Sequence, residues 1–147
     1  DVLVGDGKLA GILAEQTPDA SAVVIGIGLN VATPPGAAAQ GGLPATSLAA
    51  EGATVARDEL LLAILDEVER WYTAFREDPD PRRCGLLDAY RPLCATLGQR
   101  VRVELPSGQM LTGTAADLDP EGRLLVAERP GAPAVPVSAG DVVHVRF

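Results

Sequence analysis

Three short apolar runs, separated by turn residues, open the chain. They cover Val2–Val4, Lys8–Gln16 and Ala22–Val31, and the last is rich in β-branched side chains. The breaks between them, Gly5-Asp6-Gly7 and Thr17-Pro18-Asp19, are typical turn sequences. Because these breaks are too short to hold a crossover helix, the pattern predicts an antiparallel meander of three strands.

The apolar spacing becomes helical in the middle of the chain. Residues 32–46 are rich in Pro, Gly and Ala and predict a loop, followed by a short helix near Ser47–Glu51. Residues 57–77 carry apolar side chains three and four positions apart, as one face of a helix does. This stripe comprises Leu61, Ile64, Leu65, Val68, Trp71 or Tyr72, and Phe75. A second helical segment is expected over about 82–95, bent or ended early by Pro92.

From Gln99 onward the pattern alternates between apolar and polar positions, as in half-buried strands. Tight turns such as Pro106-Ser107-Gly108 interrupt it, and five short strands are expected up to the C-terminus. Strands of this number and length predict a small SH3-like barrel. We therefore expect an α+β protein with two domains, residues 1–96 and 97–147.

The charge, the apolar runs and the cysteines argue against several classes of function. A net charge of −8, without basic runs, argues against a nucleic-acid or anionic-membrane surface. No apolar run approaches the roughly 20 residues that span a bilayer, and no targeting segment is recognisable. Cys84 and Cys94 fit neither a metal motif nor a redox motif, so we expect reduced thiols and a cytoplasmic protein. His144 has no Cys or His neighbours at the spacing of metal ligands, so we expect an ordinary strand residue and no metal site there.

Lys8 is the sole lysine of the chain, and the other eleven basic residues are arginine. It follows Gly7, but a phosphate-binding P-loop needs Ser or Thr next, where this chain has Leu9. The dinucleotide fingerprint GxGxx[GA] matches residues 5–10 formally. However, the segment is broken by Pro18, and the next strand ends in Asn30 where an acidic ribose ligand is expected. The sequence therefore disfavours both phosphate motifs.

Three glycines interrupt the strands around Lys8. Glycine weakens the interior of a strand unless something must approach the backbone closely. Gly11, Gly26 and Gly28 could together leave a flat surface without side chains, here named the glycine floor, for a planar or extended ligand. A bulge or tight strand crossing would explain any one of them equally well, but the neighbouring Lys8 and Asn30 favour a ligand site.

Two segments carry a family resemblance: "DVLVGDGKLAGILAE" and "VVIGIGLNV" resemble the second half of the catalytic domain of bacterial biotin protein ligases. Asp1 matches the last residue of the family's KWPND, residues 8–15 its K-[LV]-[AG]-G-[IV]-L-x-E, and residues 26–30 its GxGxN. Ala45–Leu48, the leucine-rich helix and the terminal strands also fit. The resemblance covers the whole chain and implies the C-terminal half of a class II synthetase-like mixed sheet with helices, followed by an SH3-like barrel.

The resemblance also implies a reaction, ATP-dependent activation of biotin to biotinyl-5′-AMP and transfer to the acceptor lysine of a biotin carboxyl carrier protein. It makes Lys8 the catalytic residue, because a compact ammonium can bridge the biotin carboxylate and the α-phosphate. Gly11, Gly26 and Gly28 would join Lys8 in binding biotin. Asn30 and Asp1 would lie near the nucleotide and Mg²⁺. Arg146 and Asp141 are weaker candidates, for which a plain strand end is favoured.

Part of the family pattern is missing from these 147 residues. The upstream GRGRxGR loop and the first four residues of KWPND are absent, and the chain has no initiator Met. We therefore expect a fragment that is inactive without the N-terminal half of the same enzyme. A homodimer stays open, and nucleic acid would be a partner only through a preceding helix-turn-helix; no membrane partner is expected. The alternatives are a non-catalytic binding or assembly module, or a lipoate-ligase-like acyltransferase.

Overall fold

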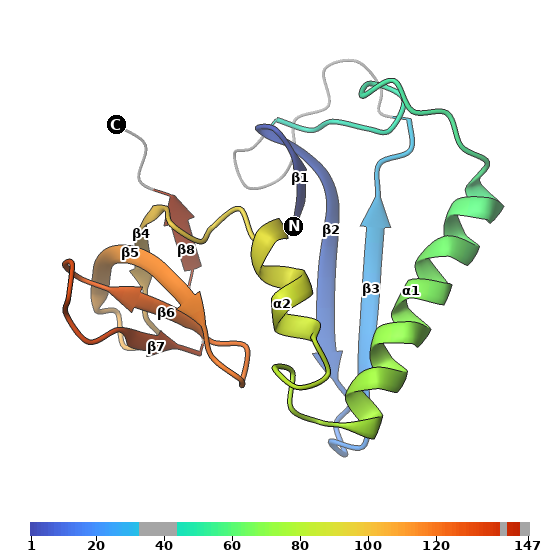
Figure 1. Cartoon of the computed structure of the whole chain (residues 1–147). Helices are drawn as coiled ribbons and strands as arrows, with labels where there is room; N and C mark the ends of the chain where they lie inside the picture. The colour runs from blue at the N-terminus through green and yellow to red at the C-terminus, as the bar shows by residue number, and fades with distance from the viewer. Residues whose placement is uncertain (33–43, 139–140, 145–147) are drawn as a thin grey trace. The chain divides into compact units, whose positions relative to one another are not determined.

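The computed structural model describes residues 1–32, 44–138 and 141–144 of the chain (Figure 1). The chain divides into two compact units, Asp1–Leu65 and Asp66–Phe147, and the division falls inside helix α1. The domain boundary near residue 97, which the change of sequence pattern indicates, stays a prediction.

The first unit contains a three-stranded antiparallel sheet in the order β1-β2-β3 (Figure 1). Its strands are β1 (Val2–Val4), β2 (Gly7–Gln16) and β3 (Val23–Leu29). Gly5 supplies the left-handed backbone (φ 55°) that the tight turn between β1 and β2 requires. The predicted meander is confirmed.

A β-bulge interrupts the ladder between β1 and β2. Val2 pairs with Ala10 and Leu3 with Lys8, so Leu9 is an extra residue on β2. In a regular strand alternate residues share a face, which would put Lys8 on the side of Ala10 and opposite to Gly11. The extra residue re-aims the side chain that precedes it. Lys8 therefore reaches the face that carries Gly11.

The two faces of this sheet differ in kind. Gly11 pairs with Gly28, and Leu13 pairs with Gly26, so these four residues share one face and three of them have no side chain. The opposite face is apolar. It comprises Ala10, Ile12 and Ala14 of β2 and Val23, Ile25, Ile27 and Leu29 of β3.

Helix α1 (Arg57–Glu77) has the predicted extent, with acidic residues in its first turn and Arg76 in its last. These charges complement the helix dipole. None of its residues is buried, and its apolar stripe is exposed. The exposed members are Leu61, Leu65, Val68, Tyr72 and Phe75.

The other predicted helices are shorter than expected. Residues 48–52 form turns rather than a helix, so the helix expected near Ser47–Glu51 is wrong. The helix expected over 82–95 reduces to α2 (Leu86–Tyr90) and a 3₁₀ turn, η1 (Arg91–Leu93). Gly85, left-handed at φ 82°, delays the start, and Pro92 prevents continuation as an α-helix. Most of the loop expected at 32–46 lies outside the described residues.

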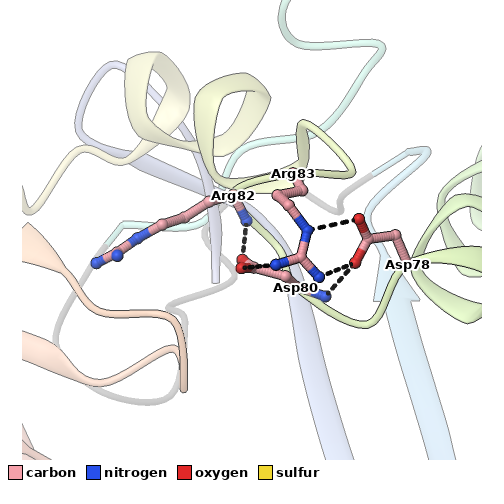
Figure 2. Close-up of polar contacts among 4 residues, drawn as sticks. All are labelled: Asp78, Asp80, Arg82 and Arg83. Atoms are coloured by element: carbon pink, nitrogen blue, oxygen red, sulfur yellow. Dashed lines mark hydrogen bonds and ion pairs between the residues drawn. The ribbon is translucent and has the colours of Figure 1, made fainter.

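The segment that follows α1 is organised by one arginine (Figure 2). Arg83 donates through Nε and Nη2 to both carboxylate oxygens of Asp78, at 2.8 and 2.6 Å, and through Nη1 to Asp80 at 3.0 Å. The backbone N–H of Arg82 also donates to Asp80. Hydrogen bonding to Arg83 holds the pKa of Asp78 below its ordinary value. Because these groups are solvent-exposed, the cluster shapes the chain after Pro79 and Pro81 rather than forming a ligand site.

The second unit contains a five-stranded antiparallel sheet in the order β7-β6-β5-β4-β8. The strands are β4 (Arg100–Glu104), β5 (Met110–Leu118), β6 (Leu124–Ala127), β7 (Val135–Val137) and β8 (Asp141–His144). Its core consists of Val101, Val103, Leu111, Ala115, Val126 and Val137. The five predicted strands are confirmed. Among the described residues the edge strands β7 and β8 do not pair, so the SH3-like sheet is not closed there.

A bidentate ion pair joins η1 to β5. Arg91 donates from Nε to Asp117 Oδ1 at 2.7 Å and from Nη2 to Oδ2 at 3.2 Å. The hydrogen bond from Arg91, followed by that from the backbone N–H of Leu118, lowers the pKa of Asp117 below its ordinary 3.8. The ionised carboxylate is therefore the form that the folded state prefers.

Asp117→Asn should lower the stability of the second unit at neutral pH by about 0.5–1 kcal/mol, a modest amount because both partners are partly exposed to solvent. A carboxyl group whose pKa is depressed by folding stabilises above its unfolded pKa and loses that contribution as pH falls through the folded value. The difference between wild type and variant should therefore shrink below about pH 4, as measured by urea unfolding across pH. Asp88→Asn is the control, since Asp88 pairs with the same arginine but is 77% exposed; an equal loss in both variants would contradict the expectation.

Two kinds of feature are absent from the described residues. No helix in this part of the chain is long and apolar enough to cross a membrane. The same residues contain no group of three or more His, Cys, Asp or Glu side chains that could hold a metal ion. Cys84 and Cys94 are free thiols.

Candidate functional site

The side chain of Lys8 lies over the glycine floor. Its Nζ is 2.8 Å from Asp1 Oδ1. A methyl group added at Gly11 would lie 3.5 Å from Lys8 Nζ and 3.7 Å from the same Asp1 oxygen. The Lys8 side chain is only 24% exposed. The ammonium is therefore held at the surface of the sheet and does not extend into bulk solvent.

The rest of the floor is open. A methyl group at Gly28 would meet only the Gly11 carbonyl, and one at Gly26 only the Leu13 carbonyl, each at 3.9 Å. Among the described residues no side chain comes within 4 Å of either position. The structure thus brings Asp1, Lys8 and the three glycines to one face of one sheet.

The peptide unit of Lys8 is fixed by three hydrogen bonds. Its N–H donates to the Pro44 carbonyl at 2.8 Å, and its carbonyl accepts from the N–H of Thr46 at 3.0 Å and from Asn30 Nδ2 at 3.2 Å. Ala45 forms a parallel bridge with Lys8. Residues 44–46 therefore continue the ladder beside β2 where β3 has ended.

Asn30 lies close to Lys8, and its backbone is hydrogen-bonded on both sides. Its backbone N–H donates to Leu9 O at 2.9 Å, and its carbonyl accepts from Leu48 N–H at 3.0 Å. Its side-chain amide donates to the Lys8 carbonyl. This bond uses one of the two N–H groups of the amide, and the nucleotide-binding role of Asn30 stays a prediction.

Sequence reasoning missed the support beneath Lys8. A Cβ at Gly7 would lie 2.8 Å from Thr46 Cβ, so only glycine lets Thr46 pack there. Thr46 and Ser47 are buried, and the Thr46 hydroxyl donates to Glu51 while Ser47 Oγ accepts from Ala50 N–H. The sequence pattern indicates only a turn at Gly7. The available signal was a pair of hydroxyl side chains, Thr46 and Ser47, next to the apolar Leu48.

Two weaker candidates cannot be placed. Arg146 lies outside the described residues. Asp141 pairs through its backbone with Glu104 in the β4–β8 ladder, and the position of its side chain is likewise outside the description. His144 belongs to β8 and pairs with Val101, as a strand residue does.

This geometry suits a ligand with a flat or extended body and an anionic end. The glycine floor permits close approach to the backbone. The ammonium beside it already holds one carboxylate, that of Asp1, and has three donors that can be shared between different oxygens.

Comparison with known proteins shows which family the chain resembles. The family described as "Biotin protein ligase C terminal domain" matches residues 96–145. The biotin–[acetyl-CoA-carboxylase] ligase of Mycobacterium tuberculosis is 44% identical over 147 residues, which is 99% of this chain and 51% of that protein. Along its whole length the chain therefore resembles biotin protein ligases. The enzyme of the same name from Paracoccus denitrificans is 40% identical over 77 residues, 48% of this chain and 32% of that protein.

The chain thus spans about half the length of the curated relative that it matches throughout. Solved structures of biotin protein ligase from Aquifex aeolicus share its fold. The apo structure has a TM-score of 0.75 at 19% identity, covering 97% of this chain and 61% of that one. The complex with biotin and ATP has a TM-score of 0.70 at 21% identity, covering 97% and 57%. The expected α+β class is confirmed.

Proposed function

We propose that this chain is the C-terminal half of a biotin protein ligase, with residues 1–96 completing the catalytic domain and 97–147 forming the SH3-like domain. One observation carries the proposal: the ammonium of the sole lysine lies over a bare strand surface, and Asp1 holds it there. The relatives' names supply the substrate class, and one neighbouring structure is a complex with biotin and ATP.

The proposed reaction has two steps. The biotin carboxylate attacks the α-phosphorus of ATP, which forms biotinyl-5′-AMP and releases pyrophosphate. The acceptor lysine of a biotin carboxyl carrier domain then attacks the acyl carbon, and AMP leaves. Lys8 lowers the first barrier by donating hydrogen bonds both to the incoming carboxylate and to the α-phosphate oxygens, on which negative charge accumulates.

The other site residues serve this step in different ways. Before biotin binds, the ion pair with Asp1 keeps the Lys8 ammonium over the glycine floor. When biotin binds, the ammonium either gives up this bond for bonds to ligand oxygens or donates to both Asp1 and the ligand. Gly11, Gly26 and Gly28 allow the biotin body to lie against the backbone. Asp1 is the carboxylate that the structure places beside the floor, and it is ion-paired. Mg²⁺ would therefore be bound here mainly by the ATP phosphates, since it usually binds through substrate phosphates and few protein ligands.

The partners follow from the same proposal. The chain needs the N-terminal half of the catalytic domain for phosphate contacts, and its macromolecular substrate is the biotin carboxyl carrier domain. We place it in the cytoplasm because of its unpaired cysteines. A homodimer and a DNA-binding segment stay predictions without support from the structure. A non-catalytic assembly module is the second candidate, and biotin binding separates the two.

Biotin-dependent exchange of labelled pyrophosphate into ATP tests the proposal. The 147-residue chain alone should show no exchange, because the upstream phosphate loop is absent. A fusion protein in which the N-terminal half of a relative is joined to Asp1 should show biotin-dependent exchange. The same fusion protein carrying Lys8→Ala is the control. Exchange by the isolated chain would overturn the fragment proposal; a folded but inactive fusion would overturn the ligase proposal.

A further inference from the structure

We propose that Gly7 and Thr46 form a size-matched contact that positions Lys8 over the glycine floor. The inference rests on the proposed function, since it concerns how the lysine of that reaction is held. The contact joins the first residue of β2 to residues 44–46, which lie beside that strand. Both are positioning residues, because they act through the Lys8 peptide.

The space that Thr46 needs, rather than the backbone conformation, explains the glycine at position 7. The backbone of Gly7 is not left-handed, whereas that of Gly5 is, at φ 55°. A Cβ at Gly7 would lie 2.8 Å from Thr46 Cβ and 2.9 Å from Thr46 Cγ2, well inside ordinary van der Waals contact. The Thr46 hydroxyl donates to Glu51, which leaves its methyl group to pack on Gly7.

This packing sets the separation between residues 44–46 and β2 beside Lys8. Two backbone hydrogen bonds join the segments there: Lys8 N–H donates to the Pro44 carbonyl at 2.8 Å, and Thr46 N–H donates to the Lys8 carbonyl at 3.0 Å. β3 does not extend far enough to pair with Lys8, and the β-bulge disrupts the ladder on the β1 side. The plane of the Lys8 peptide, from which the ammonium departs, therefore depends on how closely residues 44–46 approach.

A methyl group at position 7 should push the two segments apart. The nearest atom, Thr46 Cβ, is attached to the backbone, so no change of side-chain rotamer moves it away. Increasing this contact from 2.8 Å to an ordinary 3.4 Å requires 0.6 Å of movement. Since a misplacement of about 1 Å can lower a catalytic rate about 100-fold, we expect Gly7→Ala to cost about 10-fold.

Amide hydrogen exchange of the 147-residue chain, followed by NMR, tests the contact without any activity. Gly7→Ala should speed exchange at the Lys8 and Thr46 amides about 10-fold or more, because these N–H groups join the two segments. Thr46→Gly removes the contact without adding an atom and should act in the same direction, which keeps the test valid if Gly7→Ala does not fold. Wild-type exchange rates at both amides would overturn the proposal.

Biotin-dependent pyrophosphate exchange by the fusion protein tests the link to Lys8. Gly7→Ala should lose about 10-fold when Lys8 is present but less than about 2-fold in a Lys8→Ala background, which a general loss of stability would not reproduce. Combining Gly7→Ala with Thr46→Gly moves the Cβ from one segment to the other. This double variant should be about 3-fold more active than Gly7→Ala alone.

Thr17→Ala is the matched control. It removes a side-chain hydrogen bond to the Ala22 N–H at the far end of β2 and β3, so it should leave both the Lys8 amide and the activity unchanged. Faster amide exchange with undiminished activity, equal losses with and without Lys8, or no recovery in the double variant would overturn the positioning role alone. Activity that Lys8→Ala does not lower would overturn both this inference and the proposed role of Lys8.

Discussion

Lys8→Arg should reduce biotin adenylation about 100- to 1,000-fold, even though the positive charge is retained. Removal of one preorganised donor from a developing oxyanion typically costs this much. The guanidinium is a planar fork that prefers both oxygens of one group, whereas the proposed step requires a compact donor shared between a carboxylate and a phosphate. Its greater length would also move the charge away from the surface of Gly11, where Nζ now lies.

Biotin-dependent pyrophosphate exchange in the full-length fusion measures this loss. Lys8→Ala should lose at least as much, because it removes the donor altogether. Arg129→Lys is a charge-conserving control at an exposed position, and it should behave as wild type. Activity of Lys8→Arg within a few fold of wild type would show that net charge suffices, and the bridging role of Lys8 would then be wrong.

Gly113→Ala should have the largest effect on stability, about 3 kcal/mol. Gly113 lies in β5, and a Cβ there would come within 2.8 Å of the Ala127 carbonyl carbon and 2.9 Å of Val126 Cγ1, with the carbonyl oxygen closer still. Ala127 contributes backbone atoms of the neighbouring strand, which cannot move aside without breaking the β5–β6 ladder. Such a loss is a large fraction of the 5–15 kcal/mol that stabilises a typical domain.

Urea unfolding followed by circular dichroism would measure the change. Gly26→Ala is the matched control, because a methyl group there meets only the Leu13 carbonyl at 3.9 Å and should leave the midpoint of unfolding unchanged. Equal midpoints for Gly113→Ala and wild type would show that β6 can shift to accommodate the methyl group.

Most elements of the fold could be predicted because their hydrophobic periods are regular. The three N-terminal strands, helix α1 and the five C-terminal strands each carry a recognisable apolar pattern, and turn residues separate most of them. The short helix expected near Ser47–Glu51 is absent because the segment stops after one turn: Glu51 N–H bonds the Ser47 carbonyl, and Gly52, left-handed at φ 80°, then ends the turn. A left-handed glycine is a common helix stop.

The candidate site could be predicted by residue type but not by geometry. Gly11, Gly26 and Gly28 alternate in a way that already places them on one face once β2 and β3 pair. Lys8 does not follow this rule, since strict alternation assigns it to the apolar face with Ala10 and Ile12. Only the extra residue, Leu9, brings it across, and a bulge leaves no reliable mark in a single sequence. The hydrogen bond from the Asn30 amide to the Lys8 carbonyl joins residues 22 positions apart, and a residue pattern does not predict such a contact.

The outer position of β3 has a practical consequence for handling this polypeptide. Among the described residues β3 pairs on one side only, with β2, and its seven residues, VVIGIGL, contain neither a charge nor a proline. Natural proteins usually protect such a border with lysine, proline or a covering segment, because its free amides and carbonyls can recruit a strand from another molecule. Preparations of this polypeptide should therefore be kept dilute.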